Sequence, residues 1–170
     1  ILRGMYRVRA TTRGPARARL LGAGTILREA LAAAELLESE FGLGIDVYSV
    51  TSFTELRREA MALTRAQRLD AAPAPSWIER QLPADGTPVV AASDYVSAVA
   101  DLIRPWIRDR YLVLGTDGFG RSDTRAALRS FFEVDRRSIA LTTLVQIDSA
   151  LAQRARTLWG IHPSAPPWTR

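Results

Sequence analysis

The side chains most capable of chemistry are concentrated in one stretch, "VLGTDGFGRSDTRAALRSFF", which runs from Val113 to Phe132. Asp117, Arg121, Ser122 and Asp123 bring acidic, basic and hydroxyl groups together within seven residues, among glycines. The glycines lack Walker spacing and the sequence contains no Lys, so the stretch is not a phosphate-binding P-loop. The four polar residues are candidates for an anion site or an interface.

Ordinary structural roles are also available to these residues. Ser122 or Asp123 can supply the N-cap of the following helix, because a short oxygen-bearing side chain there accepts a hydrogen bond from a free backbone N–H. Arg121 can pair with Asp117 across the turn. The pattern favours a shaped joint between a strand and a helix over a direct ligand site.

A second candidate is the turn "GAGT", from Gly22 to Thr25. It resembles half of a dinucleotide fingerprint, but Leu27 stands where the third glycine of G-x-G-x-x-G is required. Backbone N–H groups at the start of a helix suit an anion. Gly22, Gly24 and Thr25 are therefore the anion candidates here, and a tight turn is the alternative.

Two other turns carry polar side chains at strand ends. In "VTSFTE", Ser52 has the spacing to Glu55 of a capping box, and in "SDYV", Asp94 can cap the helix that follows. Neither turn places a base beside a nucleophile, so both favour a structural role.

Composition excludes several kinds of chemistry. There is no Cys and a single histidine, His162, so thiolate nucleophiles, thiolate metal sites and histidine clusters are ruled out within this sequence. The absence of Lys rules out Schiff-base chemistry there as well. We expect His162, which lies beside Pro163 near the end of the chain, to be exposed or to have a packing role.

The positive charge is concentrated at the start of the chain. Six arginines and no acidic residue lie in the first 19 residues, against a net charge of +5 for the whole sequence. Tyr6 alone interleaves with them, whereas a base-stacking platform needs several aromatic residues. This favours a solvated strand face and predicts no nucleic-acid partner.

The sequence predicts one domain over residues 1–170. No apolar run approaches the roughly 20 residues that span a bilayer, and the start lacks the apolar segment of a signal peptide, so we expect a soluble, cytoplasmic protein with no membrane partner. The chain begins at Ile1 in a strand-like pattern. We expect it to be a domain of a longer polypeptide.

Strand-like and helical patterns alternate along the chain. Alternating or apolar runs predict strands within 4–12, 16–24, 44–52, 88–95 and 110–115. Helical spacing predicts helices within 25–42, 52–69, 96–107 and 124–132, and one long, mostly helical segment over 136–161. A proline-rich connector over 70–88 is expected to hold a short helical turn around Trp77. The order predicts an α/β fold with three layers, in which helices cover both faces of a mainly parallel sheet.

These elements carry a resemblance to a known family. The strings "DVYSVTSFTELRREA", "PVVAASDYV" and "YLVLGTDGFGRSDTRAALRSFFEVD" are similar to the C-terminal domain of the homodimeric, thiamine-diphosphate-dependent pyruvate dehydrogenases. "LRGMYRVR" and "LLGAGTILREAL" resemble the start of that domain, and "WGIHPSAPPWTR" resembles its end. The resemblance covers nearly the whole sequence.

The resemblance implies a transketolase C-terminal type of fold, with a five-stranded mixed sheet. Its first strand, here Met5 to Ala10, would lie antiparallel at an edge beside the third, Ile45 to Val50. Local sequence alone would favour a hairpin between the first and second strands. The two arguments therefore make different predictions.

The resemblance also implies a function. Such enzymes decarboxylate pyruvate on thiamine diphosphate and transfer the acetyl group to a lipoyl arm of an acetyltransferase component. The cofactor, its Mg²⁺ and the acid/base histidines belong to the preceding domains, so no catalytic, cofactor-binding or metal-binding residue is carried onto this chain. Its role would be homodimer assembly and contact with partners.

Two departures keep alternatives open. Between Arg65 and Pro88 the family usually shows Trp-Asn followed by Leu-His-Pro, whereas this chain has "RLDAAPAPSW" and a shorter connector. Ser130 stands where the family commonly has His. A diverged or split transketolase-like enzyme acting on another 2-oxo acid or sugar, and a free-standing phosphate- or nucleotide-binding module, are the alternatives.

Overall fold

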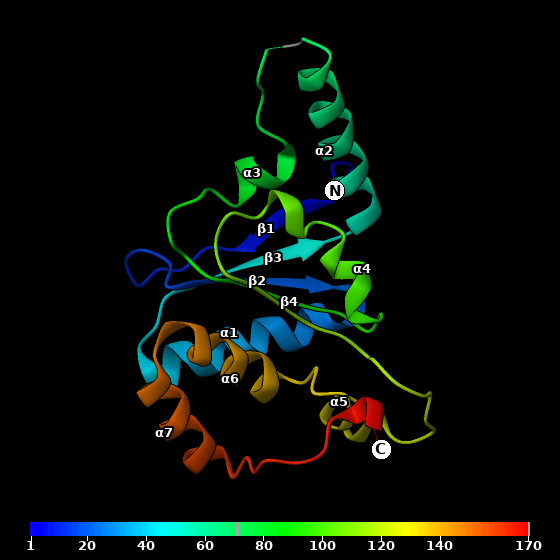
Figure 1. Ribbon diagram of the computed structural model, residues 1–170. Coiled ribbons are helices and arrows are strands. Elements are labelled where there is room, and N and C mark those ends of the chain that lie inside the picture. Colours follow the sequence, from blue (N-terminus) through cyan, green and yellow to red (C-terminus); the bar gives the residue numbers. More distant parts are fainter. Residues whose placement is uncertain (71, 170) are drawn as a thin grey trace.

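A computed structural model describes residues 1–70 and 72–169 of the chain, and it shows one mixed sheet between two layers of helices (Figure 1). Within the described residues the sheet has five strands in the order β1-β3-β2-β4-β5. Their bounds are β1 Met5–Arg9, β2 Ala18–Ala23, β3 Ile45–Val50, β4 Val89–Ala92 and β5 Tyr111–Leu114. The predicted α/β class and strand number are confirmed.

The first strand lies at the edge and runs antiparallel to β3, with Met5 opposite Val50 and Arg7 opposite Tyr48. The other neighbouring strands are parallel. The edge position implied by the family resemblance is confirmed, and the local hairpin is wrong. β2 is hydrogen-bonded to β3 on one side and β4 on the other, so β1 pairs with the free side of β3.

Helices cover the two faces of the sheet (Figure 1). One layer contains α1 Leu27–Phe41, α6 Arg136–Ile147 and α7 Ser149–Trp159. The other contains α2 Phe53–Arg68, α3 Trp77–Gln81 and α4 Ser97–Asp101. The short α5, Arg125–Phe131, follows the long loop after β5. Single 3₁₀ turns are η1 Gly24–Ile26, η2 Arg104–Trp106 and η3 Pro167–Thr169.

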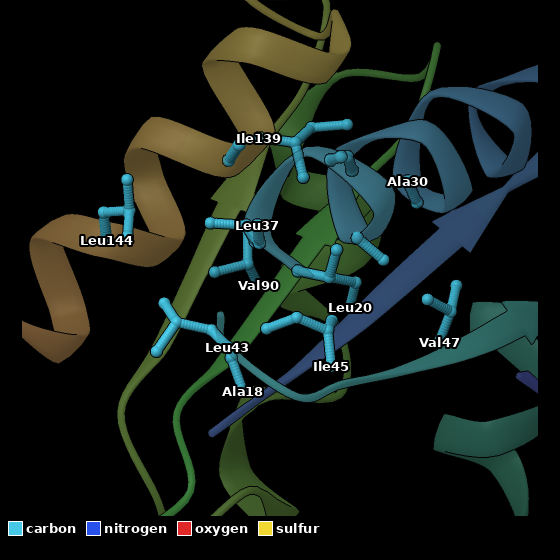
Figure 2. Packing of buried hydrophobic residues seen from close by; sticks show 14 of the residues in the cluster. Ala18, Leu20, Ala30, Leu37, Leu43, Ile45, Val47, Val90, Ile139 and Leu144 are labelled. Atoms are coloured by element: carbon cyan, nitrogen blue, oxygen red, sulfur yellow. The ribbon is translucent and has the colours of Figure 1, made fainter. Parts of the chain in front are cut away.

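Alternation along the strands divides the buried side chains between the two layers. Leu20, Val47 and Val90 pack toward α1 and α6 (Figure 2), whereas Leu21 and Tyr48 belong to the cluster under α2, α3 and α4. A strand side chain points to the opposite face from its neighbours, so a central parallel strand is apolar on both sides. This two-sided core fixes the strand ends at which the candidate residues lie.

Three local predictions need comment. β2 resembled the half-exposed first strand, but it is buried along its whole length, including Arg19, because it is the central strand. The segment over 136–161 is two helices, because the chain breaks at Asp148, whose carboxylate accepts a hydrogen bond from the N–H of Ala150. The helical turn around Trp77 is confirmed, and Ser76 is its N-cap. Ala71, within the predicted connector, lies outside the described residues.

Candidate functional site at the carboxyl ends of the strands

The candidate turns meet where the topology changes direction. From β2 the chain crosses to β3 on one side, and from β3 it returns to β4 on the other. In open α/β sheets the carboxyl ends at such a point usually form the ligand crevice. Gly24 and Thr25 follow β2, and Asp94 follows β4, so these residues lie at the crevice.

The Asp94 carboxylate lies against Gly24 and Thr25 of the glycine turn. The Thr25 hydroxyl donates to Asp94 Oδ2 at 3.3 Å. Gly24 has φ +55°, and a Cβ there would lie 3.2 Å from Asp94 Oδ1. A carboxylate this close repels a second anion, so the arrangement does not suit a phosphate on the N–H groups of this turn. The predicted capping of the next helix by Asp94 is wrong, because the carboxylate faces Thr25.

Gly22 has a packing role within β2. A Cβ added there would lie 2.6 Å from the Cα of Leu27 and 3.2 Å from the Cβ of Ala30. The first turn of α1 therefore lies directly against the strand, and a side chain at position 22 would separate them. This contact accounts for the first glycine of the turn without a ligand.

Two hollows flank the Gly24–Asp94 contact. One, of about 690 Å³, is lined by Thr25, Asp94, Arg121 and Asp123, with apolar side chains that include Phe132. A second, of about 580 Å³, lies on the other side, between the ends of β2 and β3 and the start of α2. The fold thus brings together two turns that the sequence presents as separate candidates.

The loop after β5 is firmly attached at its base. The N–H of Thr116 donates to the Tyr95 carbonyl at 2.9 Å, and the N–H of Ser97 donates to Asp117 Oδ1 at 3.1 Å. Gly115 is pressed against the backbone, since a Cβ there would lie 2.4 Å from the Ser97 nitrogen. The loop base therefore has one shape, set by its contacts with the β4–α4 connection.

The roles predicted for the polar residues of this loop are corrected. Asp117 accepts from the backbone of Ser97, and the Arg121 guanidinium lies 4.1 Å from the ring centroid of Phe131 rather than beside Asp117. The N-cap of α5 is Thr124, which accepts from the N–H of Ala127 at 3.3 Å. The helix begins at Arg125, so Ser122 and Asp123 lie too early to cap it.

A buried carboxylate that sequence reasoning missed holds the wall of this site. Glu29, on α1, is 5% exposed and accepts from Arg129 Nη1 at 2.9 Å and from Arg136 Nε at 3.0 Å. Arg129 also donates to the Thr25 hydroxyl at 3.3 Å. The network joins α1, α5 and α6 to the glycine turn. The signal in the sequence that could have revealed Glu29 is its spacing. It lies four residues before Ala33, and so on the same face of the helix as the buried alanines.

The opposite charges of Glu29 and Arg136 stabilise each other. Burial alone would raise the pKa of the Glu29 carboxyl, but hydrogen bonds and charge from Arg136, with charge from Arg129, lower that pKa below its usual value. The same hydrogen bond raises the pKa of Arg136. Glu29 is therefore a charged residue that holds the structure together. Its lowered pKa makes it a weaker base than an ordinary carboxylate, which does not suit a general base.

The arginines near the start of the chain are largely paired within the fold. Arg7 and Arg9, on β1, reach carboxylates of β3 and α1, and Arg19 reaches carboxylates beyond α3. The pairs are Arg3 over the Trp77 ring, Arg7 with Asp46, Arg9 with Glu38 and Glu35, and Arg19 with Asp85 and Asp109. The carboxylates compensate part of the positive charge at the start of the chain.

Family membership follows from the whole of this architecture and sequence. The family of transketolase-like TK C-terminal domains matches residues 4–135. The chain belongs to this family. The edge strand β1 and the loop after β5 both fall inside the matched range.

Curated relatives of this transketolase-like domain are considerably longer proteins. The chain is 48% identical to the pyruvate dehydrogenase E1 component of Pseudomonas aeruginosa, over 96% of this chain and 20% of that protein. It is 40% identical to the pyruvate dehydrogenase E1 component of Escherichia coli K12, over 86% of this chain and 17% of that protein. The chain therefore spans about a fifth of the length of these relatives.

Solved transketolases share the fold of this domain. The transketolase from Leishmania mexicana matches with a TM-score of 0.57 at 24% identity, over 89% of this chain and 18% of that one. The transketolase from Campylobacter jejuni matches with a TM-score of 0.59 at 19% identity, over 85% of this chain and 19% of that one. At these identities the likeness establishes the fold.

The remaining sequence candidates give no metal centre. Among residues 1–70 and 72–169, no group of three or more His, Cys, Asp or Glu side chains is placed to hold a metal ion. His162 is exposed, beside a hollow near the end of α7. Across the same described residues, every helix is too short or too polar to cross a membrane.

Proposed function

We propose that this chain is the non-catalytic C-terminal domain of a thiamine-diphosphate-dependent pyruvate dehydrogenase. The whole enzyme would decarboxylate pyruvate and transfer the acetyl group to the lipoyl arm of an acetyltransferase component. The observation that carries the proposal is the 48% identity to a pyruvate dehydrogenase E1 component across 96% of the chain. At this identity over a full domain, a shared role is the simplest explanation.

We place thiamine diphosphate and Mg²⁺ in the preceding domains or subunit. Thiamine diphosphate supplies the electron sink for decarboxylation where it is bound. The residues of this chain do not fit that group: the Asp94 carboxylate lies against the Gly24 turn, and the described carboxylates form no metal cluster. No step of the reaction is therefore assigned to this chain.

The role that we propose for this domain is homodimer assembly and contact with the other parts of the enzyme. The candidates Gly22, Gly24 and Thr25 would shape the edge, through packing against α1 and the bond to Asp94. Arg121 and Asp123, which line the larger hollow, would make contacts across an interface. Asp117 would position the loop by holding Ser97. For Ser122 we propose the same interface role by its place in this loop.

The alternatives are less well supported. A free-standing phosphate-binding module would need the "GAGT" turn, where the Asp94 carboxylate already lies. A diverged enzyme for another 2-oxo acid or sugar remains an alternative on the strength of Ser130, which lines the hollow near His162. Neither Ser130 nor His162 lines the two hollows beside the Gly24–Asp94 contact.

A domain exchange tests the proposed function. In the Pseudomonas aeruginosa component, the matched region is replaced by this chain, and a second version has that region deleted. Pyruvate-dependent reduction of an electron acceptor is then measured with thiamine diphosphate and Mg²⁺. We expect the exchanged enzyme to turn over and the deleted version to lose assembly and activity. Residues 1–170 alone, checked for cooperative unfolding, should show no turnover.

Two results would contradict the proposal. Turnover of pyruvate by residues 1–170 alone would place the chemistry in this chain. An exchanged enzyme that assembles and binds thiamine diphosphate, yet turns over another 2-oxo acid in place of pyruvate, would favour the diverged enzyme.

A further inference from the structure

Large apolar side chains are exposed at the carboxyl ends of the strands. Phe119 is 85% exposed at the tip of the loop after β5, and Tyr95 and Val96 are 58% and 48% exposed in the β4–α4 connection. The two segments touch, because the N–H of Thr116 bonds to the carbonyl of Tyr95. We call Tyr95, Val96 and Phe119 the apolar rim. Burial of a side chain as large as Phe contributes about 1.5–3 kcal/mol, so such exposure marks a contact surface.

The base of the loop that carries Phe119 is held in place before any partner arrives. Gly118 and Gly120 flank Phe119, and Gly118 has φ +112°, a conformation that favours glycine. Below the tip, Gly115 and Asp117 are attached to the backbone of Ser97. A projecting aromatic side chain on an anchored base loses little conformational entropy on binding. This is the construction expected of an inserted anchor.

Charged side chains border the rim. Arg121 lies over the Phe131 ring, and Arg121, Asp123 and Arg125 line the hollow behind Phe119. Aromatic and arginine side chains dominate the energetic centres of protein interfaces. The composition of this edge therefore suits a protein surface with an apolar cavity and a polar border.

The chain also enters the domain at this edge. β1 is antiparallel, so its first residue, Met5, pairs with Val50 at the carboxyl end of β3. Just before it, the Ile1 carbonyl accepts from the Thr51 hydroxyl at 3.0 Å. In Figure 1 the N-terminus lies near the head of the β3 arrow. Any domain that precedes Ile1 is thus joined on the side where the apolar rim lies.

We propose that the domains that carry thiamine diphosphate pack against the apolar rim, and that Phe119 inserts into an apolar cavity on them. This inference rests on the proposed function. The matched relative leaves about four fifths of its length outside this region, which is ample for such a body. The entry of the chain and the rim lie on one side, so the two surfaces need no long linker to meet.

Photo-crosslinking identifies what covers the rim. In the full-length polypeptide that carries residues 1–170, p-benzoylphenylalanine is placed at position 119, and in a matched control at Leu158, which is 56% exposed on α7. After irradiation, crosslinked peptides are mapped by mass spectrometry. We expect position 119 to crosslink to peptides of the preceding domains and position 158 to give none of these products. Crosslinks to the C-terminal domain of a second copy, or to a separate protein only, would overturn the proposal, and so would equal yields at both positions.

A truncation variant measures the contribution of the anchor. We expect Phe119→Ala in the full-length polypeptide to raise the rate at which trypsin releases this domain by about tenfold or more, as for an interface anchor. Leu158→Ala should leave that rate unchanged. A Phe119→Ala rate equal to that of the unmodified protein would overturn the anchor role.

The proposed function and this inference fail in different ways. If the full-length polypeptide binds thiamine diphosphate but Phe119 crosslinks elsewhere, the inference falls and the proposed function stands. If the polypeptide contains no domain that binds thiamine diphosphate, both the proposed function and this inference are wrong.

Discussion

The two ends of the parallel strands are built in opposite ways. At the amino ends, buried Arg19 donates to the Pro83 carbonyl at 3.1 Å and pairs with Asp85 and Asp109, so segments that precede β4 and β5 are tied together. At the carboxyl ends, hollows remain open and Phe119 projects from its loop.

The difference indicates a division between stability and contact. At the amino ends of the strands, the charge of Arg19 is paired with Asp85 and Asp109 inside the domain. At the other end the backbone of the turns is fixed, but apolar side chains are left without cover. We therefore expect substitutions at the amino end to change folding, and those at the carboxyl tip to change assembly.

The largest effect is expected at the closed end. Arg19→Met removes the buried guanidinium and leaves Asp109, which is mostly buried, without its cation. We expect a loss of about 2–4 kcal/mol in the free energy of unfolding, measured by urea titration. The pair with Asp85 contributes only a small part of this loss, because that carboxylate is partly exposed to solvent. Arg17→Met makes the same change of charge at an exposed position and should cost less than about 0.5 kcal/mol. Equal losses in the two variants would show that this end is not closed by Arg19.

The next effect tests whether the loop base is anchored. Gly115→Ala places a Cβ 2.4 Å from the Ser97 nitrogen, so the backbone must move. We expect a loss of about 1–3 kcal/mol in urea unfolding. Gly120→Ala is the matched control, because among the described residues no heavy atom would lie within 4 Å of its Cβ. If both variants unfold alike, the loop base is loose and the rim is not preorganised.

The architecture could be predicted from sequence, but not the details of the edge. Alternation from Gly4 to Thr12 and helical spacing fixed the order of elements, and the family resemblance supplied the antiparallel β1. Local pattern failed at Arg19, because burial of a charged residue depends on carboxylates more than 60 positions away. The mostly helical segment over 136–161 was predicted, but its division into two helices at Asp148 was not, since an Asp is equally compatible with an exposed helix position and with a cap.

The candidate site shows the same limit. The sequence identified Thr25 and Arg121 as candidates in competing turns at the carboxyl ends of the strands. It could not tell which of these turns are neighbours, because the adjacency of β2 and β4 arises only from the crossover. It could not identify Asp94 as the group facing Gly24, nor the bonds from Glu29 to Arg129. These contacts join residues far apart in the sequence, so no local sequence pattern predicts them.

A smaller effect depends on acidity. The hydrogen bond from Arg19, with support from Thr87, lowers the pKa of the Asp85 carboxyl from its usual 3.8 to about 2. A lowered folded-state pKa contributes stability that is complete above the usual value, so this contribution should be lost as the pH falls from about 4 to about 2. The carboxylate is 45% exposed, so solvent reduces the size of the effect. Urea midpoints of the unmodified chain and of Asp85→Asn should converge over this range, and parallel curves would contradict the assignment.

The smallest change in stability, and the clearest separation of the two ends, is expected from Arg121→Ala. Its guanidinium lies 4.1 Å from the Phe131 ring at an exposed site, so we expect a loss of about 0.5–1 kcal/mol in the free energy of unfolding. Arg154→Ala is a matched control, because that guanidinium lies 5.4 Å from the Phe41 ring, away from the carboxyl ends. In the full-length enzyme only Arg121→Ala should increase subunit or domain dissociation, measured by sedimentation, while the affinity for thiamine diphosphate in the assembled form stays unchanged. Intact assembly with loss of thiamine diphosphate binding would instead place Arg121 at the cofactor, and the contrast between a closed, stabilising end and an open, contacting end would no longer describe the molecule.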